Sequence, residues 1–535
     1  MIAALLAVAL YVAAFPPLDA GPLAFVALAP WCWIARRWRG GRLFLAGSLV
    51  GAGILAIGCF WIRRTHPLNL AFMVVPESLF FGGFALLLRA IHVTRRWPAL
   101  VALPLAFTAI EFVRGRWPLD GFPWLTFGYT QHRWLEIVQV SALAGVHGVT
   151  FLLALVAGAL CDAWPGEKGR RRIVGVAVAA GAVGAAAIGG HAALGDPAAL
   201  ARGPRLLLVQ PNFEQNLKDD PASWDRILAR HFELEDAALA REKADLVVWS
   251  ETIVPVPWPS EGDDHESDDP RLVERRAAVR VALKQGLFGR HRLPLLAGAA
   301  TYEATASEPL PRLFNSVLLF DAAGRRVATY DKRVLVPGGE YLPWIDRFPD
   351  ALAEWIRGRV LEMAGFPPDL SRGTRSGVVD LSSVGSRGRA GMTVCYEMVY
   401  PDLGRDLVKG GADLLVNLSN EGWFHETSEF EQFSAIAAFR AAETRRSLVR
   451  CANTGTSGWF DPWGRPHLFV VAGATDGVAG ALVVEPPLST VVTPYVRFGE
   501  WVGAGAAIAA LLALVRRRRG SKSRPESVTA AARST

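Results

Sequence analysis

The chain has 535 residues, of which 51% are hydrophobic and only 20% are charged. This composition excludes an ordinary soluble enzyme, because soluble domains carry about 25% charged residues and the apolar excess here is confined to the N-terminal third and a short C-terminal stretch. The formal net charge of +7 does not indicate nucleic-acid binding, since much of it is arginine in short clusters beside apolar runs. That pattern is typical of membrane topology.

Eight apolar segments are candidates for membrane helices, seven before the central region and one after it. They lie at residues 2–15, 22–35, 43–62, 70–91, 99–113, 137–160, 173–194 and 501–515. The first resembles a signal peptide, but it lacks a charged n-region and further apolar segments follow at once, so we interpret it as a retained helix. We therefore expect a membrane domain of seven helices over residues 1–200 and an eighth helix within residues 496–519.

Basic residues predict the orientation, because lysine and arginine accumulate in cytoplasmic loops. If the N-terminus is inside, most basic clusters fall inside: Arg36, Arg37, Arg39, Arg42, Arg95, Arg96, Lys168, Arg170, Arg171, Arg172 and residues 516–519. A minority falls outside: Arg63, Arg64, Arg114, Arg116 and Arg133. The large domain between the seventh and eighth helices is therefore predicted to be extracytoplasmic.

That central domain, residues 201–495, has the composition of a soluble protein. Short apolar runs predict strands at residues 206–209, 246–249, 295–298, 317–321, 391–394 and 414–418. Helical patterns lie between them at residues 224–243, 271–285 and 430–443. Such alternation predicts an α/β domain. The acidic stretch 260–270 is expected to be a solvated loop, and residues 520–535 are expected to be a disordered tail.

Five cysteines are dispersed along the chain, at positions 32, 59, 161, 395 and 451. No CxxC motif or Cys/His cluster predicts a zinc site, and no dense even set predicts a disulfide framework. We therefore expect free thiols, no metal and no cofactor.

Reactive side chains follow two of these predicted strands and one further short segment. Glu251 comes after the run at 246–249, Lys332 follows Tyr330-Asp331, and Cys395 ends the run at 391–394. A thiol with a carboxylate and an ammonium group can transfer acyl groups without histidine. The carboxylate accepts the thiol proton, the thiolate attacks a carbonyl, and the ammonium with a backbone N–H stabilises the oxyanion. A strand-terminal cysteine in apolar surroundings is more often a core residue, so the residues alone leave both readings open.

The chain order of Glu251, Lys332 and Cys395 resembles the Glu-Lys-Cys triad of the nitrilase superfamily of carbon–nitrogen hydrolases. Together with the apolar segments, the chain is similar over residues 1–515 to the apolipoprotein N-acyltransferase family. Four membrane-side motifs carry that likeness: Glu111-Phe-Val-Arg114, Gly121-Phe-Pro-Trp124, residues 144–151 and residues 493–501. The resemblance implies an eight-helix membrane bundle plus a nitrilase-like αββα sandwich.

The resemblance also implies a ping-pong reaction. Glu251 would be the general base, and Cys395 would take a fatty acyl chain from a phospholipid, typically phosphatidylethanolamine, as a thioester. Lys332 and the backbone N–H of Tyr396 would hold the oxyanion. The acceptor would be the α-amino group of a diacylglyceryl-cysteine at a lipoprotein N-terminus. The implied location is the bacterial inner membrane, with the catalytic domain on the periplasmic side, and we expect a monomer.

Further residues match supporting positions of that family. Glu340 and Glu397 would orient Lys332 and the thiol, because carboxylates beside an ammonium keep it charged and fixed. The implied substrate contacts are Trp423, Phe424, Asn417 and Trp124, with Trp124 at the membrane interface beside an acyl groove walled in part by Tyr396.

Two acidic residues fall in apolar spans. Glu77 lies inside the fourth span, where an unpaired charge is expensive, so we expect it to be functional or paired. Glu111 lies in the fifth span and has Arg114 one turn away as the expected partner.

The chain departs from the family pattern at several places: Asp219 follows Lys218 where tryptophan is common, Gly338 replaces a phenylalanine, no Gly-Pro-His follows Phe424, and residues 350–366 resemble an insertion. Two alternatives to the acyltransferase stay open at this point. One is a membrane-anchored amidase in which water resolves the thioester. The other is a non-catalytic paralogue that binds lipid, against which the intact Glu251, Lys332 and Cys395 argue.

Overall fold

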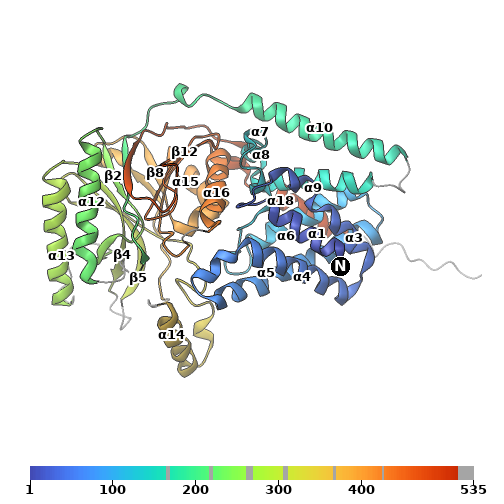
Figure 1. The fold of residues 1–535 in the computed structure, drawn as a ribbon, viewed down its shortest axis with the longest axis horizontal. Coiled ribbons are helices and arrows are strands. Elements are labelled where there is room, and N and C mark those ends of the chain that lie inside the picture. Colours follow the sequence, from blue (N-terminus) through green and yellow to red (C-terminus); the bar gives the residue numbers. More distant parts are fainter. Residues whose placement is uncertain are drawn as a thin grey trace, which may run out of the picture.

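The computed structural model describes residues 1–163, 169–215, 221–260, 269–304, 311–364, 369–424 and 427–515. Most of the predicted acidic loop, Lys168, Lys218, Asp219, residues 516–519 and the predicted tail lie outside these ranges. A helical part and a part built on two β-sheets lie side by side along the long axis of the molecule (Figure 1).

Each of the eight predicted apolar segments contains helix. The main elements are α1 (Ile2–Ala13), α3 (Ala29–Arg37), α4 (Gly40–Gly58), α5 (Pro67–Leu88), α6 (Ala99–Arg114), α9 (Val146–Asp162), α10 (Gly169–Ala193) and α18 (Trp501–Val515). Three helical spans, at residues 40–58, 67–94 and 172–193, are long and apolar enough to cross a membrane. The described residues therefore show fewer full spans than the eight expected.

Two of the expected spans are broken. The segment 22–35 consists of η1 (Gly21–Leu23), α2 (Ala24–Ala27) and α3, with Pro22 and Pro30 each at the start of a piece, as a residue without an N–H requires. The segment 137–160 bends by 117° between α8 (Val140–Ala144) and α9. Gly145 stands at the bend with φ of 69°, a backbone conformation that glycine adopts without strain. Counted as one span, this bent pair would be a fourth.

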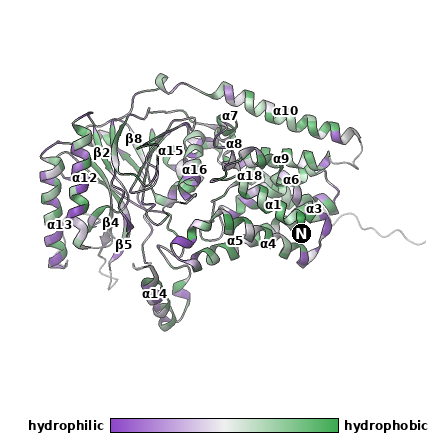
Figure 2. Ribbon diagram, viewed as in Figure 1, coloured by the Kyte–Doolittle hydropathy of each residue, from purple (hydrophilic) through white to green (hydrophobic). Residues whose placement is uncertain are grey.

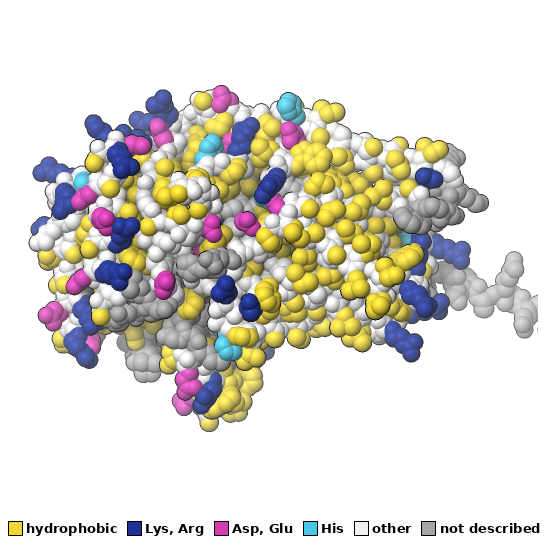
Figure 3. Space-filling model, in the orientation of Figure 1, with side chains coloured by type: hydrophobic (Ala, Val, Ile, Leu, Met, Phe, Trp, Pro, Cys, Tyr) yellow, Lys and Arg dark blue, Asp and Glu magenta, His cyan; other side chains and the backbone are white. Residues whose placement is uncertain are grey.

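The surface of the helical part has the character of a membrane protein. Hydrophobic side chains cover it in one broad area, whereas charged residues intersperse the sheet-containing part (Figure 3), and the helices are mostly apolar, with hydrophilic residues at some of their ends (Figure 2). Lysine and arginine gather at the end farthest from the sheets. There Arg36 lies 3.0 Å from His92, and Arg95 donates to the carbonyl of Leu514 over 2.7 Å. The predicted basic loops 36–42 and 95–96 thus meet at one end of the bundle.

Residues 206–484 contain the two sheets. The first contains β1 (Leu206–Gln210), β2 (Leu246–Trp249), β3 (Val254–Pro259), β4 (Leu295–Glu303), β5 (Arg312–Phe320), β6 (Arg326–Asp331) and β13 (Gly480–Val484), in the order β13-β1-β2-β4-β5-β6 with β3 beside β4. The second contains β7 (Val378–Asp380), β8 (Arg389–Val394), β9 (Leu414–Ser419), β10 (Ser447–Ala452), β11 (Gly458–Phe460) and β12 (Pro466–Leu468), in the order β12-β11-β10-β9-β8-β7. In each sheet the three central strands, β1-β2-β4 and β8-β9-β10, are parallel.

The layers form the predicted αββα sandwich. One core lies between the sheets, where Leu208 and Val248 face Met392 and Val416. A second core lies between the first sheet and helices α12 (Trp224–Leu239) and α13 (Pro270–Leu283). The second sheet is covered by α15 (Pro401–Lys409) and α16 (Glu429–Thr444). All six predicted strands and three predicted helices are confirmed; β3, β6, β7, β10–β13, α14 (Asp350–Ala364) and α15 were not predicted.

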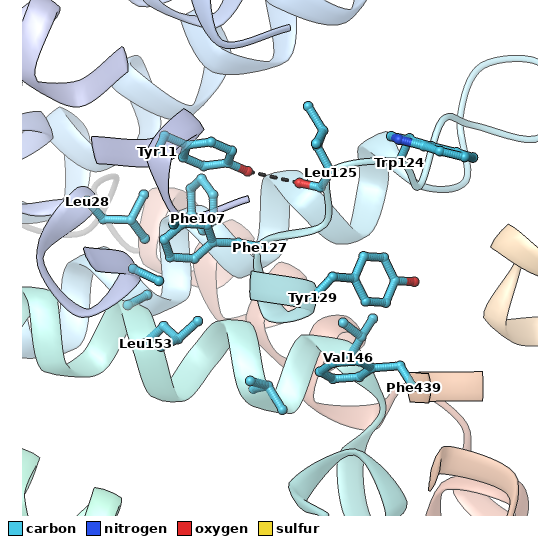
Figure 4. Close-up of a cluster of buried hydrophobic side chains, with 14 of the residues drawn as sticks. Tyr11, Leu28, Phe107, Trp124, Leu125, Phe127, Tyr129, Val146, Leu153 and Phe439 are labelled. Atoms are coloured by element: carbon cyan, nitrogen blue, oxygen red, sulfur yellow. Dashed lines mark hydrogen bonds between the residues drawn. The ribbon is translucent and has the colours of Figure 1, made fainter. Parts of the chain in front are cut away.

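Helix α16 is the element that joins the two parts, because almost all of its residues are buried. The apolar core of the helical bundle continues without interruption into α15 and α16. At this junction Phe439 of α16 lies beside Val146 and Tyr129 of the bundle (Figure 4). Because α16 is buried on nearly all sides, the two-sheet part packs directly against the bundle.

Candidate active site

The three reactive residues predicted from the sequence meet where the two sheets face each other. Glu251 follows β2, Lys332 follows β6, and Cys395 follows β8. Lys332 Nζ lies 3.9 Å from Glu251 Oε1 and 2.8 Å from Glu340 Oε1. The thiol of Cys395 interacts electrostatically with all three of these charged groups. The structure therefore brings a thiol, an ammonium and two carboxylates into one cluster, of which Lys332 is 1% exposed.

The backbone at Cys395 is held in an uncommon conformation. Its φ is 50°, a left-handed geometry that costs energy for a residue with a side chain and is found at functional sites. β8 ends immediately before it, and the short helix η10 (Cys395–Val399) begins with it. Asn417 Nδ2 donates to the Cys395 carbonyl over 3.2 Å. This sharp turn places Cys395 at the end of the strand.

Glu397 fixes the two halves of the site to each other. It is fully buried and accepts the N–H of Val394 from the cysteine side, over 2.8 Å. It also accepts the N–H groups of Arg333 and Val334, over 2.6 and 3.0 Å, and the hydroxyl of Tyr330. Burial raises the pKa of Glu397, while Lys332 and these N–H groups oppose that rise. One carboxylate thus sets the position of Lys332 relative to Cys395.

Asn315 was not predicted from the sequence, yet it touches three members of the cluster. Its side-chain amide donates to Glu251 over 2.7 Å and to Glu340 over 3.3 Å. Its backbone carbonyl accepts the backbone N–H of Lys332. Glu340 in turn accepts the N–H of Val336 over 2.9 Å. The available signal was the pair Asn315-Ser316 inside an otherwise apolar strand.

The neighbouring strand approaches Glu251 closely because residue 298 is a glycine. A Cβ on Gly298 would lie 2.6 Å from the Glu251 Cα and 2.5 Å from the N of Thr252, distances that no side chain tolerates. Thr252 itself has φ of 43°. The turn that carries Glu251 is therefore as tightly constrained as the turn that carries Cys395.

The charges of the cluster set its protonation at rest. Burial opposes the charged form of Lys332, but Glu340 and Glu251 outweigh it and raise the pKa, so the ammonium stays charged. Burial raises the pKa of the Cys395 thiol, and Glu251 adds to that rise, while Lys332 opposes it. The thiol is therefore protonated at neutral pH, and it would need a base in order to act as a nucleophile.

Aromatic side chains form the boundary between the cluster and the bundle. The ring of Trp124 stacks on Tyr396 with centroids 6.1 Å apart, and Phe122 lies 6.5 Å from the same ring. Trp61 lies 5.0 Å from Trp124 and 4.8 Å from Phe424. These residues come from the bundle loops and from the two sheet loops after β8 and β9.

Gln432 of α16, another residue that the sequence did not single out, ties this boundary together. Its Oε1 accepts the indole N–H groups of Trp124 and Trp61, over 2.7 and 3.2 Å. Its Nε2 donates to the carbonyls of Pro16 and Gly58. One side chain thus connects α16 with three separate segments of the bundle.

The predicted substrate contacts divide into two groups. Trp423 and Phe424 are half-buried and can present a surface to a ligand. Asn417 is fully buried and donates to the hydroxyl and the carbonyl of Thr393 and to the carbonyl of Cys395, which is a positioning role. Trp124 is 2% exposed, so the expectation of an interfacial side chain is wrong: its indole N–H is satisfied by Gln432 inside the protein rather than by the membrane surface.

The partner expected for Glu111 is shared with a second carboxylate. Glu111 accepts the N–H of Phe127 and the hydroxyl of Thr150, each over 2.7 Å, and interacts electrostatically with Arg114. Arg114 also lies 3.6 Å from Glu77, because α5 packs against α6. Across the described ranges, no group of three or more His, Cys, Asp or Glu side chains could hold a metal ion.

Comparisons with known proteins cover both parts of the chain. Residues 7–159 match the model of the apolipoprotein N-acyltransferase N-terminal domain, and residues 208–493 match that of carbon-nitrogen hydrolase. The apolipoprotein N-acyltransferase of Azotobacter vinelandii is 32% identical over 98% of this chain and 96% of that protein. The one from Caulobacter vibrioides is 30% identical over 86% and 83%.

Among solved structures, the nitrilase-superfamily protein Nit3 of Saccharomyces cerevisiae is similar at 17% identity, with a TM-score of 0.37, over 60% of this chain and 98% of that one. The family assignment rests on the domain models and the full-length relatives. The chain belongs to the apolipoprotein N-acyltransferase family, whose central domain is that of the carbon–nitrogen hydrolases.

Proposed function

We propose that the protein transfers a fatty acyl chain from a membrane phospholipid to the amino terminus of a lipoprotein, through a thioester on Cys395. The observation that carries this proposal is the cluster of Cys395, Lys332, Glu251 and Glu340 at the sheet ends, buried against an apolar bundle. A nucleophile at the boundary of a membrane part is suited to substrates whose chains lie in a bilayer and whose esters lie at its surface.

The first half-reaction forms the acyl-enzyme. As the Cys395 sulfur attacks the ester carbonyl, its proton passes to Glu251, and the negative charge moves to the carbonyl oxygen. Lys332 Nζ and the N–H of Tyr396 stabilise that oxyanion. When the intermediate collapses, the ester C–O bond breaks and the proton on Glu251 passes to the departing lysophospholipid oxygen.

The second half-reaction transfers the chain to an amine. The acceptor α-ammonium loses one proton to solvent, and its nitrogen then attacks the thioester carbonyl. Glu251 accepts the second proton from nitrogen as the bond forms, and returns it to sulfur as the C–S bond breaks. The products are an amide and the free thiol. Lys332 stays charged throughout, because Glu340 lies 2.8 Å from it.

The proposed arrangement in the cell follows from the charge distribution. Residues 1–200 and 496–519 would form the membrane part and residues 201–495 the catalytic domain. Because the basic clusters gather at the far end of the bundle and positive loops face the cytoplasm, the catalytic domain would face the periplasm of an inner membrane. Phosphatidylethanolamine is the proposed donor, a diacylglyceryl lipoprotein the proposed acceptor, and the protein is proposed to act as a monomer.

A two-stage assay tests the proposal. Full-length protein in phospholipid nanodiscs should form a hydroxylamine-sensitive acyl adduct on Cys395, which mass spectrometry locates, and Cys395→Ala should abolish it. Addition of a diacylated lipopeptide should then discharge the adduct with formation of an N-acyl product. Release of free fatty acid without N-acylation would favour an amidase-like hydrolase. Absence of any adduct in the wild type would overturn the enzymatic proposal.

A further inference from the structure

One carboxylate of the membrane part has no role in the mechanism above. Glu77 lies within α5 and is 7% exposed. Its Oε2 atom is buried and has no hydrogen-bond partner among the residues that the structure describes. Its ion pair with Arg114 spans 3.6 Å, which is longer than a hydrogen bond. A carboxylate is expensive to keep in an apolar span, and this one retains capacity for a further hydrogen-bond donor.

Arg114 is occupied by other partners. It donates to the carbonyls of Phe122 and Trp124, over 3.0 and 2.9 Å. It also interacts electrostatically with Glu111 as well as with Glu77. Two carboxylates therefore share one guanidinium, and when both are ionised the three groups together carry one negative charge in excess. That excess favours a cationic ligand.

Glu77 is electrostatically linked to the segment that carries the thiol. It interacts electrostatically with Tyr396, the residue after the nucleophile. The loop that carries Glu340 lies over the outer end of α5, since a Cβ on Gly338 would come within 3.8 Å of the Phe72 ring. α5 runs from this boundary into the bundle (Figure 1). A head group bound at Glu77 would therefore precede the reacting centre on a path from the bilayer.

The flank of this site is apolar. Phe72, Val75 and Leu79 of α5 are exposed on the lipid side. An exposed apolar helix face beside a carboxylate suits the chains of an amphipathic molecule whose head is cationic.

We propose that Glu77 recognises the primary ammonium group of a lipid substrate before that lipid reaches Cys395. The inference rests on the proposed function. Both substrates carry this chemistry: the ethanolamine ammonium of the donor phospholipid and the α-ammonium of the lipidated acceptor. A primary ammonium donates charge-assisted hydrogen bonds to a carboxylate, whereas a trimethylammonium of equal charge has no N–H to donate.

The donor arm compares phosphatidylethanolamine with phosphatidylcholine of identical chains, in nanodiscs containing full-length protein. The rate of acyl-enzyme formation should favour the ethanolamine donor by about tenfold in the wild type, the effect of one charge-assisted hydrogen bond. Glu77→Gln, which keeps the shape and removes the charge, should bring that ratio to about one. Asp162→Asn is the matched control, because this buried carboxylate caps the other end of α6 through Ala99 and Leu100.

The acceptor arm measures KM and kcat for a diacylated lipopeptide with a free amino terminus. If the acceptor supplies the ammonium, Glu77→Gln leaves the donor ratio unchanged and raises this KM by about tenfold, with kcat little altered. Either result supports the proposal. The proposal is overturned if Glu77→Gln changes neither the donor ratio nor the lipopeptide KM. It is also overturned if the variant slows the reactions of both phospholipids and of the lipopeptide equally, because Glu77 would then serve only as the counterion of Arg114.

A binding measurement separates this inference from the proposed function. In the Cys395→Ala background no acyl transfer occurs, and native mass spectrometry can compare retention of the two phospholipids and of the lipopeptide with and without Glu77→Gln. Preferential retention of a primary ammonium lipid that disappears with Glu77→Gln supports the ammonium site even if the wild type forms no thioester. If the Cys395→Ala protein retains the primary ammonium lipids equally well with and without Glu77→Gln, the ammonium site is contradicted.

Discussion

The side-chain amide of Asn315 donates a hydrogen bond to the carboxylate of Glu251 over 2.7 Å. Glu251 is the proposed base, and a base is effective only when its free lone pair points at the proton it removes. The same amide also reaches Glu340, and the Asn315 carbonyl holds the backbone of Lys332. A neutral side chain therefore orients the charged residues of the cluster without altering their total charge.

Substitution of Asn315 should slow acylation, and a negatively charged replacement should slow it more than a neutral one. Asn315→Ala leaves Glu251 and Glu340 without their shared donor, and acyl-enzyme formation should fall about 10- to 100-fold. Asn315→Asp should fall further, because a third carboxylate opposes ionisation of Glu251. Single-turnover acylation measures both. Ser316→Ala is the control, since its hydroxyl bonds to Asp331 instead. Faster acylation by Asn315→Asp than by Asn315→Ala would contradict this role.

Neutralising Glu251 should make the Cys395 thiol react faster with alkylating agents, although it abolishes acyl transfer. Burial and Glu251 raise the pKa of Cys395, so alkylation of Cys395 between about pH 7 and about pH 9 should be slower than that of a free thiol. Alkylation is slower because a raised pKa leaves a smaller fraction of the thiol as thiolate at a given pH. Glu251→Gln removes one negative charge, lowers the thiol pKa and should speed alkylation while acyl transfer is lost.

Peptide-resolved mass spectrometry separates Cys395 from the four other cysteines in that experiment. Lys332→Met provides the opposite case: removal of the opposing positive charge should raise the thiol pKa further and slow alkylation. A Glu251→Gln protein alkylated more slowly than the wild type would show that Glu251 does not act on the thiol.

The sequence predicted six of the thirteen strands of the described residues, and the chain order of the reactive residues, because both depend on local patterns. An apolar run of four to six residues is a strand of a buried parallel sheet, and the residue after it lies at the sheet edge. The short strands β7, β11 and β12 escaped prediction, since they have three residues each and β12 is largely exposed. Likewise, the apolar composition of segments 22–35 and 137–160 predicted one continuous span for each. Prolines break the first segment, and a glycine stands at the bend of the second.

The residues that escaped prediction at the site make contacts distant in sequence. Gln432 reaches Trp124 across 308 positions and Pro16 across 416, and no spacing rule connects such residues. Trp124 was predicted as a functional residue, but its burial depends on α16 packing onto the bundle. Gln432 is one of several polar residues on α16, and the sequence does not reveal which of them the bundle covers.

Substitution of Glu397 should lower both stability and the rate of acylation, whereas substitution of its partner Tyr330 should lower stability alone. Glu397→Gln replaces an acceptor of three N–H groups with a side chain that also carries donors, and should destabilise the sheet domain by about 2 kcal/mol and slow acylation about 100-fold. Tyr330→Phe removes one donor and should cost about 1 kcal/mol, with acylation near that of the wild type. Thermal unfolding in detergent and single-turnover acylation measure the two effects; equal loss of acylation in both variants would contradict a specific role for the carboxylate.

Gln432 should couple the bundle to the catalytic cluster through Trp124. Gln432→Leu leaves two indole N–H groups and two carbonyls without partners, and each buried polar group left unpaired costs about 1–3 kcal/mol. The variant should unfold at lower temperature and show altered tryptophan fluorescence. Gln432→Glu retains the acceptor for Trp124 and Trp61 but loses the donor to Pro16 and Gly58, so it should keep the fluorescence of the wild type while still losing stability. If both variants show the wild-type melting temperature and acylate at the wild-type rate, the contacts of Gln432 contribute nothing to the coupling, and the stacked rings of Trp124 and Tyr396 must hold the boundary by packing alone.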